Sequence, residues 1–175
     1  MKWGVVMSGG LSMVLAVGAA AQVPAGVKAD WERSKKNVIA YARAMPDSAT
    51  GFRPTRGVRT FAEQFDHIVA SNQDIAAITL KGLKGAPAMG DSAKYLHNKA
   101  ALVAYLTASY DYVLAALSQA KPADLSRSVP VWGLPSQPVS RWLEMALEHS
   151  VWTLGQVVPY LRLNGVKPPD YDIPF

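Results

Sequence analysis

The 175-residue chain contains no cysteine, which excludes disulfide bonds, a thiol nucleophile and thiolate metal ligands. It also lacks the short motifs of several common catalytic sites, namely a G-x-S-x-G nucleophile elbow, a Walker phosphate loop and an H-E-x-x-H zinc motif. Histidine is scarce, because the whole chain holds three. Chemistry that needs an imidazole therefore depends on His67, His97 and His149.

Charge is also sparse and scattered along the chain. Only 18% of the residues are charged and half are apolar, which is typical of a compact globular protein and not of a disordered one. The formal net charge is +5, but no run of lysine and arginine is longer than Lys35-Lys36. The sequence thus shows no basic patch of the kind that binds nucleic acid, and we expect one domain with no nucleic-acid partner.

The N-terminal residues have the pattern of a secretory signal. Lys2 precedes an apolar segment that is too short and too rich in glycine for a typical membrane span. Ala19–Ala21 supplies the small residues of a signal-peptidase site, which predicts cleavage before Gln22. A membrane anchor is the alternative. We expect residues 1–21 to be a cleaved signal peptide and residues 22–175 to be a periplasmic or secreted domain without stable membrane insertion.

Four segments carry apolar residues at the spacing of amphipathic helices, which predicts an all-α four-helix bundle. The expected helices cover residues 28–45, 60–80, 92–119 and 139–164. Thr60 and Glu63 have the spacing of a capping box, which makes the start of the second helix the clearest boundary. The side chains expected to be buried are Phe65, Ile68, Leu106, Val113, Leu143, Ala146 and Val157.

The last predicted helix carries a single imidazole on a mostly apolar face. Steps of three or four residues from His149 lead to Trp142, Ala146, Thr153, Val157 and Tyr160. Gly165 follows as a candidate residue for ending the helix, and Pro168-Pro169 prevents it from resuming.

Two stretches resemble the DinB-like superfamily. The run from His149 to Pro169, with Gly155-Gln156 inside it, looks like the last helix of that family. The run from Phe52 to Phe61, followed by His67, looks like the start of its second helix. The resemblance implies a four-helix bundle of the DinB-like type with long crossover connections, and the long connection over residues 121–138 agrees with that. We expect this proline-rich connection to cover one end of the bundle.

The resemblance also implies a metal site, but this chain carries an incomplete version of it. Many members bind a divalent metal through three histidines, one from the second helix and two that lie four residues apart in the last helix. His67 matches the first ligand and His149 the second, whereas Thr153 stands at the third position. A neutral hydroxyl replaces an imidazole poorly. The implied cofactor is a divalent metal such as Zn, Ni or Mn.

Three outcomes stay open for this site. A replacement ligand completes it, or the two histidines and water hold a metal weakly, or the site is vestigial and the histidines bond to each other, to water or to Thr153. The residues considered as replacement ligands are Asp74, Glu63 and His97.

The resemblance implies a metal-dependent enzyme of the hydrolase or thiol-transferase type, with catalytic residues that the sequence does not identify. Thiol transfer is disfavoured because the third ligand is missing and because an exported protein leaves the compartment in which thiols are kept reduced. The alternative is a non-enzymatic bundle that binds a small molecule in the old metal cavity or forms a homodimer. Arg53, Arg56 and Arg59 could attract an anionic ligand, although solvated surface charge is their more ordinary role.

Overall fold

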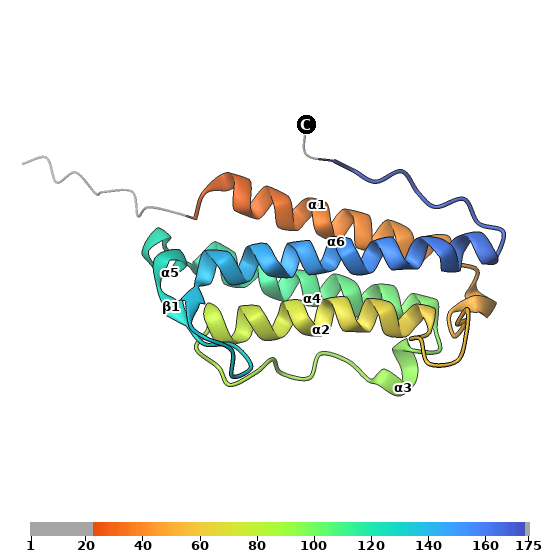
Figure 1. Ribbon diagram of the computed structural model, residues 1–175, viewed down its shortest axis with the longest axis horizontal. Helices are drawn as coiled ribbons and strands as arrows, with labels where there is room; N and C mark the ends of the chain where they lie inside the picture. Colours follow the sequence, from red (N-terminus) through yellow and green to blue (C-terminus); the bar gives the residue numbers. More distant parts are fainter. Residues whose placement is uncertain (1–22, 174–175) are drawn as a thin grey trace, which may run out of the picture.

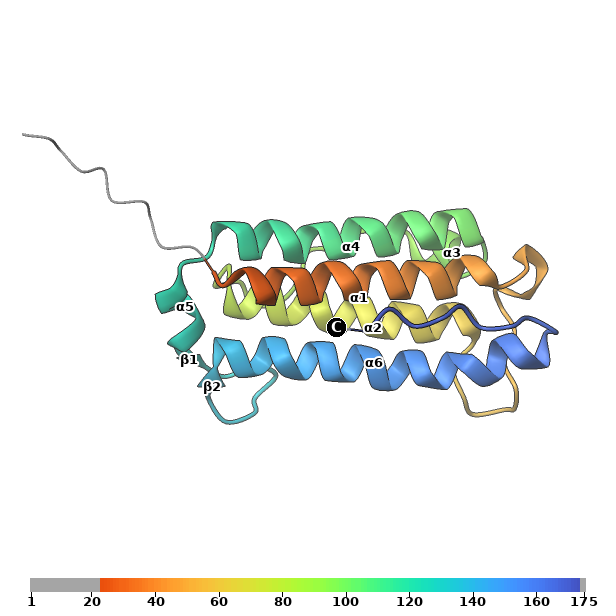
Figure 2. The same cartoon turned by 90° about the horizontal axis from the view of Figure 1, so that it is seen from above.

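The computed structural model describes residues 23–173, and the predicted signal peptide with its cleavage site lies outside them. Its main feature is a bundle of four long helices that lie side by side (Figures 1 and 2). Their bounds are α1 Ala25–Ala44, α2 Phe61–Thr79, α4 Lys99–Gln119 and α6 Val139–Leu163. The predicted all-α bundle is confirmed.

The helices form a ring in which α1 and α2 each pack against both α4 and α6. Figures 1 and 2 show that α1 and α6 run in one direction and that α2 and α4 run in the other. Because α2 and α4 are parallel, the chain between them must return along the length of the bundle. The crossover is therefore the connection over residues 80–98, whereas residues 120–138 join two helix ends that lie at the same end of the bundle.

The third predicted helix is wrong in its first part. Residues 92–119 form two helices, the short α3 (Ser92–Tyr95) and then α4, which are separated by a turn at residues 96–98. Asn98 causes the new start, because its side chain accepts a hydrogen bond from the backbone N–H of Ala101 at 2.8 Å. The helical spacing of the apolar residues continues through this break, so periodicity alone does not show it.

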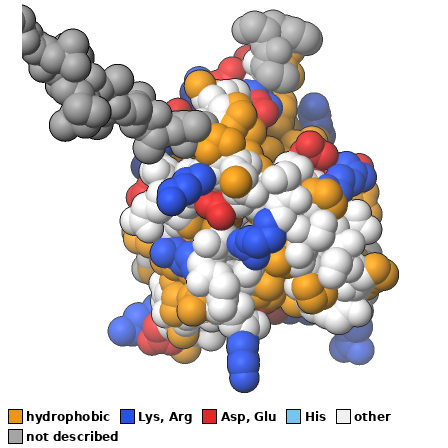
Figure 3. Space-filling model, turned by 90° about the vertical axis from the view of Figure 1, so that its left-hand side faces the viewer, with side chains coloured by type: hydrophobic (Ala, Val, Ile, Leu, Met, Phe, Trp, Pro, Cys, Tyr) orange, Lys and Arg blue, Asp and Glu red, His pale blue; other side chains and the backbone are white. Residues whose placement is uncertain are grey.

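The connection after α4 covers one end of the bundle, as predicted (Figure 1). It contains the short helix α5 (Pro122–Ser126) and two strands, β1 (Ser128–Val129) and β2 (Gln137–Pro138), which pair antiparallel. An end-on view shows lysine and arginine side chains spread among apolar ones on this face (Figure 3). The visible charges do not gather into one basic patch, in agreement with the scattered charge of the sequence.

The ends of α2 and α6 are fixed by local hydrogen bonds. At the start of α2 the backbone N–H of Glu63 donates to the Thr60 hydroxyl at 3.2 Å, and the N–H of Thr60 donates to the Glu63 carboxylate at 2.6 Å. After α6 the chain turns at Gly165 with φ +73°. The N–H groups of Gly165 and Val166 donate to the last carbonyls of the helix, which is a Schellman ending.

The core confirms the predicted burial and adds a polar layer. All seven side chains that were expected to be buried are at most 2% exposed. Hydrogen bonds cross the core between the Ser34 and Tyr110 hydroxyls at 2.8 Å, and from the Asn72 amide to the Ser150 hydroxyl at 3.0 Å. Burial raises the pKa of Tyr110 to about 12, so it remains a neutral hydrogen-bonding group. These bonds join α1 to α4 and α2 to α6 near the middle of the bundle.

Helix α4 is long and apolar enough to cross a membrane by composition. In the bundle, however, its apolar residues Leu102, Leu106 and Val113 are fully buried, and the helix packs against α1 and α2. A helix that buries its apolar residues inside a bundle can pass this test of length and composition without crossing a membrane.

Candidate functional site

The two predicted histidines lie next to each other. His67 comes from the middle of α2 and His149 from the middle of α6, and these two helices pack against one another. The Nε2 atoms of the two rings are 3.0 Å apart. Their expected approach is therefore confirmed, at a partly exposed place between α2 and α6, whereas their role as metal ligands stays a prediction.

Thr153 lies beside the pair, one turn along α6 from His149. It is 1% exposed, and its hydroxyl oxygen is 3.4 Å from Nε2 of His149. This is a long and weak hydrogen bond. The buried hydroxyl therefore sits at the third position that the resemblance implies, but a neutral hydroxyl oxygen is a weaker metal ligand than an imidazole nitrogen.

Both imidazoles are held in the neutral form. Burial lowers the pKa of His67, and the positive charges of Arg59 and His149 lower it further against an opposing effect of Asp66. Burial and the charge of Arg59 also lower the pKa of His149. Neutral imidazole is the form that binds a metal and the form that accepts a hydrogen bond. The same charge of Arg59 opposes a cation, although its exposed position weakens the effect by solvent screening.

The spacing of the two rings helps to distinguish a direct hydrogen bond between them from an arrangement that could bind one ion. In a straight hydrogen bond of this length the ring centroids would lie about 5.3 Å apart, because each centroid is about 1.1 Å behind its nitrogen. Two imidazoles bound at about 2.05 Å to one ion would have nitrogens about 2.9 Å and centroids about 4.5 Å apart at a right angle, and about 3.3 Å and about 5.2 Å apart at the tetrahedral angle typical of zinc. The observed distances are 3.0 and 4.7 Å, with the ring planes at 84°. The rings are therefore closer together than in a straight hydrogen bond, and their spacing is nearest to that of two ligands at a right angle on one ion.

His149 carries a second unusual feature. Its Nδ1 atom is buried and has no hydrogen-bond partner among the described residues. Metal-binding histidines usually donate this second N–H to a carboxylate or carbonyl, which fixes the tautomer. His149 lacks that support, so the pair fits a metal less well than its Nε2 geometry alone indicates.

None of the three residues considered as replacement ligands joins the pair. Glu63 is held in the capping box, and the Asp74 carboxylate accepts from the N–H of Ala86 at 2.7 Å and from the Trp132 indole at 3.2 Å. His97 is exposed in the turn before α4. Within residues 23–173, no group of three or more histidine and carboxylate side chains could hold a metal ion.

A depression of about 510 Å³ lies beside His67, at the end of the bundle where α2 begins. Sequence reasoning had placed three arginines near this end, and two of them line the depression. The lining residues are Arg53, Gly57, Val58, Arg59, Glu63, Asp66, His67 and Ala70. The depression gives small molecules a route to at least one imidazole of the pair.

Asp66 also lines the depression, and the sequence analysis assigned no role to it. Its carboxylate oxygen Oδ1 accepts hydrogen bonds from the hydroxyls of Tyr95 at 2.9 Å and Tyr105 at 3.2 Å. The two tyrosine rings are stacked, with centroids 4.0 Å apart. Burial and the Asp66 charge raise the pKa of both tyrosines, so they remain protonated donors. The only sequence signal for this role was that Asp66 precedes His67. Its two partners, Tyr95 and Tyr105, come from the crossover and from α4, so the sequence does not reveal them.

Trp152 is a second feature that was missed. Its ring centroid is 6.4 Å from that of His149, and its side chain is 68% exposed. The three-residue spacing places both side chains on neighbouring positions of α6. Trp152 thus flanks the outer side of the imidazole without covering it.

Fold and site together define a four-helix bundle with a pair of neutral histidines on facing helices. The family model of the DinB superfamily matches residues 30–157, and the chain belongs to this superfamily. A DinB-like protein from Bacillus subtilis has a similar structure, with a TM-score of 0.70 and 16% identity over 83% of this chain and 97% of that chain. A DinB-like protein from Bacillus cereus gives 0.70 and 18% over 85% and 97%. No curated protein matches the chain.

Proposed function

We propose that this DinB superfamily member binds a divalent metal through His67 and His149, with a small-molecule ligand entering from the adjacent depression. The observation that carries the proposal is the close approach of two neutral imidazoles from facing helices, whose nitrogens lie 3.0 Å apart and whose centroids lie 4.7 Å apart. Zn, Ni and Mn are the candidate ions, and Zn and Ni are preferred because imidazole suits them, whereas Mn prefers oxygen ligands. A metal bound here would act as a Lewis acid or lower the pKa of a bound water, as in a metal-dependent hydrolase or transferase.

Binding by two protein ligands is expected to be weak. Catalytic zinc sites commonly use three protein ligands, and here the third position holds the Thr153 hydroxyl. The unpartnered Nδ1 of His149 weakens the site further, since supporting contacts of this kind change metal affinity by about 10- to 100-fold.

Replacing Thr153 by histidine tests the proposal. Thr153→His adds a third imidazole one turn from His149, and we expect it to tighten the binding of Zn²⁺ or Ni²⁺ by about 100-fold or more, as a ligand contributes at least as much as its supporting contact. Calorimetry on the wild type and the variant measures the change. His67→Ala and His149→Ala should abolish the weak binding, whereas His97→Ala, which removes an exposed imidazole, should leave it unchanged.

Two results would contradict the proposal. If the wild type shows no binding and Thr153→His does not create it, then His67 and His149 are not metal ligands. If His97→Ala weakens binding as much as His67→Ala, the metal is bound elsewhere. A stoichiometric, tight complex with the wild type would instead mean that a third ligand exists, and Asp66 would be the first residue to replace because it lines the same depression.

A metal-free binding protein is the second candidate. It is favoured because, within residues 23–173, the pair belongs to no group of three or more histidine and carboxylate side chains that could hold a metal ion. In this case the two imidazoles share a proton, and the bundle binds a small molecule in the depression or forms a homodimer. Metal analysis of the purified protein, together with its mass in solution, separates this candidate from the first.

A further inference from the structure

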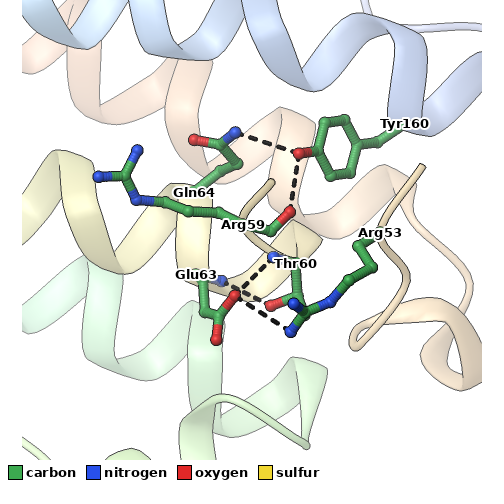
Figure 4. A network of polar contacts seen from close by, with 6 residues as sticks. All are labelled: Arg53, Arg59, Thr60, Glu63, Gln64 and Tyr160. Atoms are coloured by element: carbon green, nitrogen blue, oxygen red, sulfur yellow. Dashed lines mark hydrogen bonds and ion pairs between the residues drawn. The ribbon is translucent and has the colours of Figure 1, made fainter. Parts of the chain in front are cut away.

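The backbone of Arg59 is fixed at the rim of the depression. Its carbonyl accepts a hydrogen bond from the Tyr160 hydroxyl at 2.8 Å, and the same hydroxyl accepts from the Gln64 amide at 3.1 Å (Figure 4). The next residue, Thr60, begins the capping box of α2. An exposed arginine in the loop before a helix is therefore attached through its backbone to both α2 and α6.

The guanidinium of Arg59, in contrast, has no hydrogen-bond or ion-pair partner within residues 23–173, although the other charges around the depression do. Arg53 lies 3.6 Å from the Glu63 carboxylate, and Asp66 accepts from two tyrosines. Figure 4 shows the Arg59 guanidinium pointing away from the ion pair of Arg53 and Glu63. Arg59 thus supplies the one side-chain charge in the wall of the depression that no other described residue binds.

The free guanidinium also lies close to the histidine pair. Arg59 and His67 line the same depression, and the charge of Arg59 acts on both imidazoles. A molecule that contacts the guanidinium therefore lies within reach of His67.

We infer that Arg59 binds the carboxylate or phosphate group of the small molecule that occupies this depression. The inference rests on the proposed function, because it takes the histidine pair as the reactive or binding centre. The guanidinium offers a planar fork of N–H donors that matches two oxygens of such a group, which makes arginine the common choice for these anions. The depression is open to solvent, so a small anion can reach the guanidinium directly. The ligand class is therefore a small organic acid or phosphate ester.

A comparison of two neighbouring arginines tests the inference in the full chain. Arg56 lies in the same loop and is exposed, but it does not line the depression, so Arg56→Ala is the matched control for Arg59→Ala. Inorganic phosphate and succinate serve as probes, and the uncharged diamide of succinic acid serves as the negative probe. Binding is followed by NMR through the ring signals of His67 and His149, which are assigned with the corresponding alanine variants.

We expect phosphate or succinate to shift the His67 signals with the same dissociation constant in the wild type and in Arg56→Ala. Arg59→Ala should weaken that binding about tenfold or more, because a charge-assisted pair of hydrogen bonds is lost. If Arg59→Ala does not fold, Arg59→Gln, which keeps most of the side-chain length, makes the same comparison. Equal binding by the Arg56 and Arg59 variants, equal binding of the neutral diamide, or no binding of either anion would overturn the inference.

The test separates this inference from the proposed function. If metal binding depends on His67 and His149 but anion binding is the same with and without Arg59, the inference is rejected and the proposed function is kept. Anion binding that needs Arg59 in a protein that binds no metal rejects the metal proposal and keeps the inference.

Discussion

At the scale of single residues, the protein places two neutral imidazoles where burial and a nearby guanidinium disfavour their protonation. The folded pKa values of His67 and His149 lie below the ordinary value of 6.5, first because of burial and then because of Arg59. The unfolded chain therefore binds protons more readily than the folded chain in the range just below pH 6.5. Protonation of these two rings therefore destabilises the folded state relative to the unfolded chain.

This difference predicts a loss of stability in mild acid. As the pH falls from about 7 through the unfolded pKa toward the lower folded values, the free energy of unfolding should decrease, and it should level off below the folded values. Denaturant unfolding between pH 8 and pH 5 measures the slope. His67→Gln with His149→Gln should flatten that slope, and His97→Gln, which replaces an exposed imidazole, is the control variant. A wild-type slope identical to that of the double variant would show that the pair does not titrate in this way.

The histidine pair could be predicted from the sequence, but the surroundings could not. His149 and Thr153 share a face through their four-residue spacing, and the resemblance placed His67 opposite. The bonds of Asp66 to two tyrosines, and the unpartnered Nδ1 of His149, depend on how side chains from different helices meet. Helical spacing carries no information about such contacts.

At the scale of elements, the capping box of α2 supports both the helix and the wall of the depression. Thr60 and Glu63 exchange two hydrogen bonds, and Glu63 also lies near Arg53. Thr60→Ala should destabilise the protein by about 1 kcal/mol, the usual effect of losing such a cap. Thr55→Ala, in the exposed loop before it, is the matched control. Denaturant melts compare the two, and an equal effect of both substitutions would show that the cap contributes no specific stability.

The two prediction errors at this scale have different physical origins. The break before α4 comes from the Asn98 cap, which competes locally with a helix that the apolar spacing allows to continue. The crossover lies after α2 and not after α4, although the later connection looked suitable by length. The sequence shows how long a connection is. It does not show whether the connection joins helix ends at the same end of the bundle or at opposite ends. The capping box of α2 and the Gly165 ending of α6 were predicted correctly because both are local.

At the scale of the whole molecule, the described bundle builds its core from residues that follow the predicted signal peptide. Its first fully buried side chain is Trp31, and the core continues to Leu161. The apolar residues before Gln22 have the pattern of an export signal, so we propose that the mature domain is periplasmic or secreted. The overall bundle and its buried faces were predictable because apolar periodicity extends over whole helices and tolerates local errors.

Processing of the N-terminus tests this proposal directly. Signal peptidase needs small side chains at the first and third positions before the cleaved bond, which here are Ala21 and Ala19. Expression in a bacterium, followed by intact-mass measurement of the periplasmic fraction, should give a chain that begins at Gln22. Ala21→Arg should block cleavage and leave the chain attached to the membrane, whereas Ala20→Arg, between the two required positions, should be processed normally. A soluble chain that retains Met1 in the cytoplasm would contradict the export proposal, because the segment would then be an ordinary part of the mature protein.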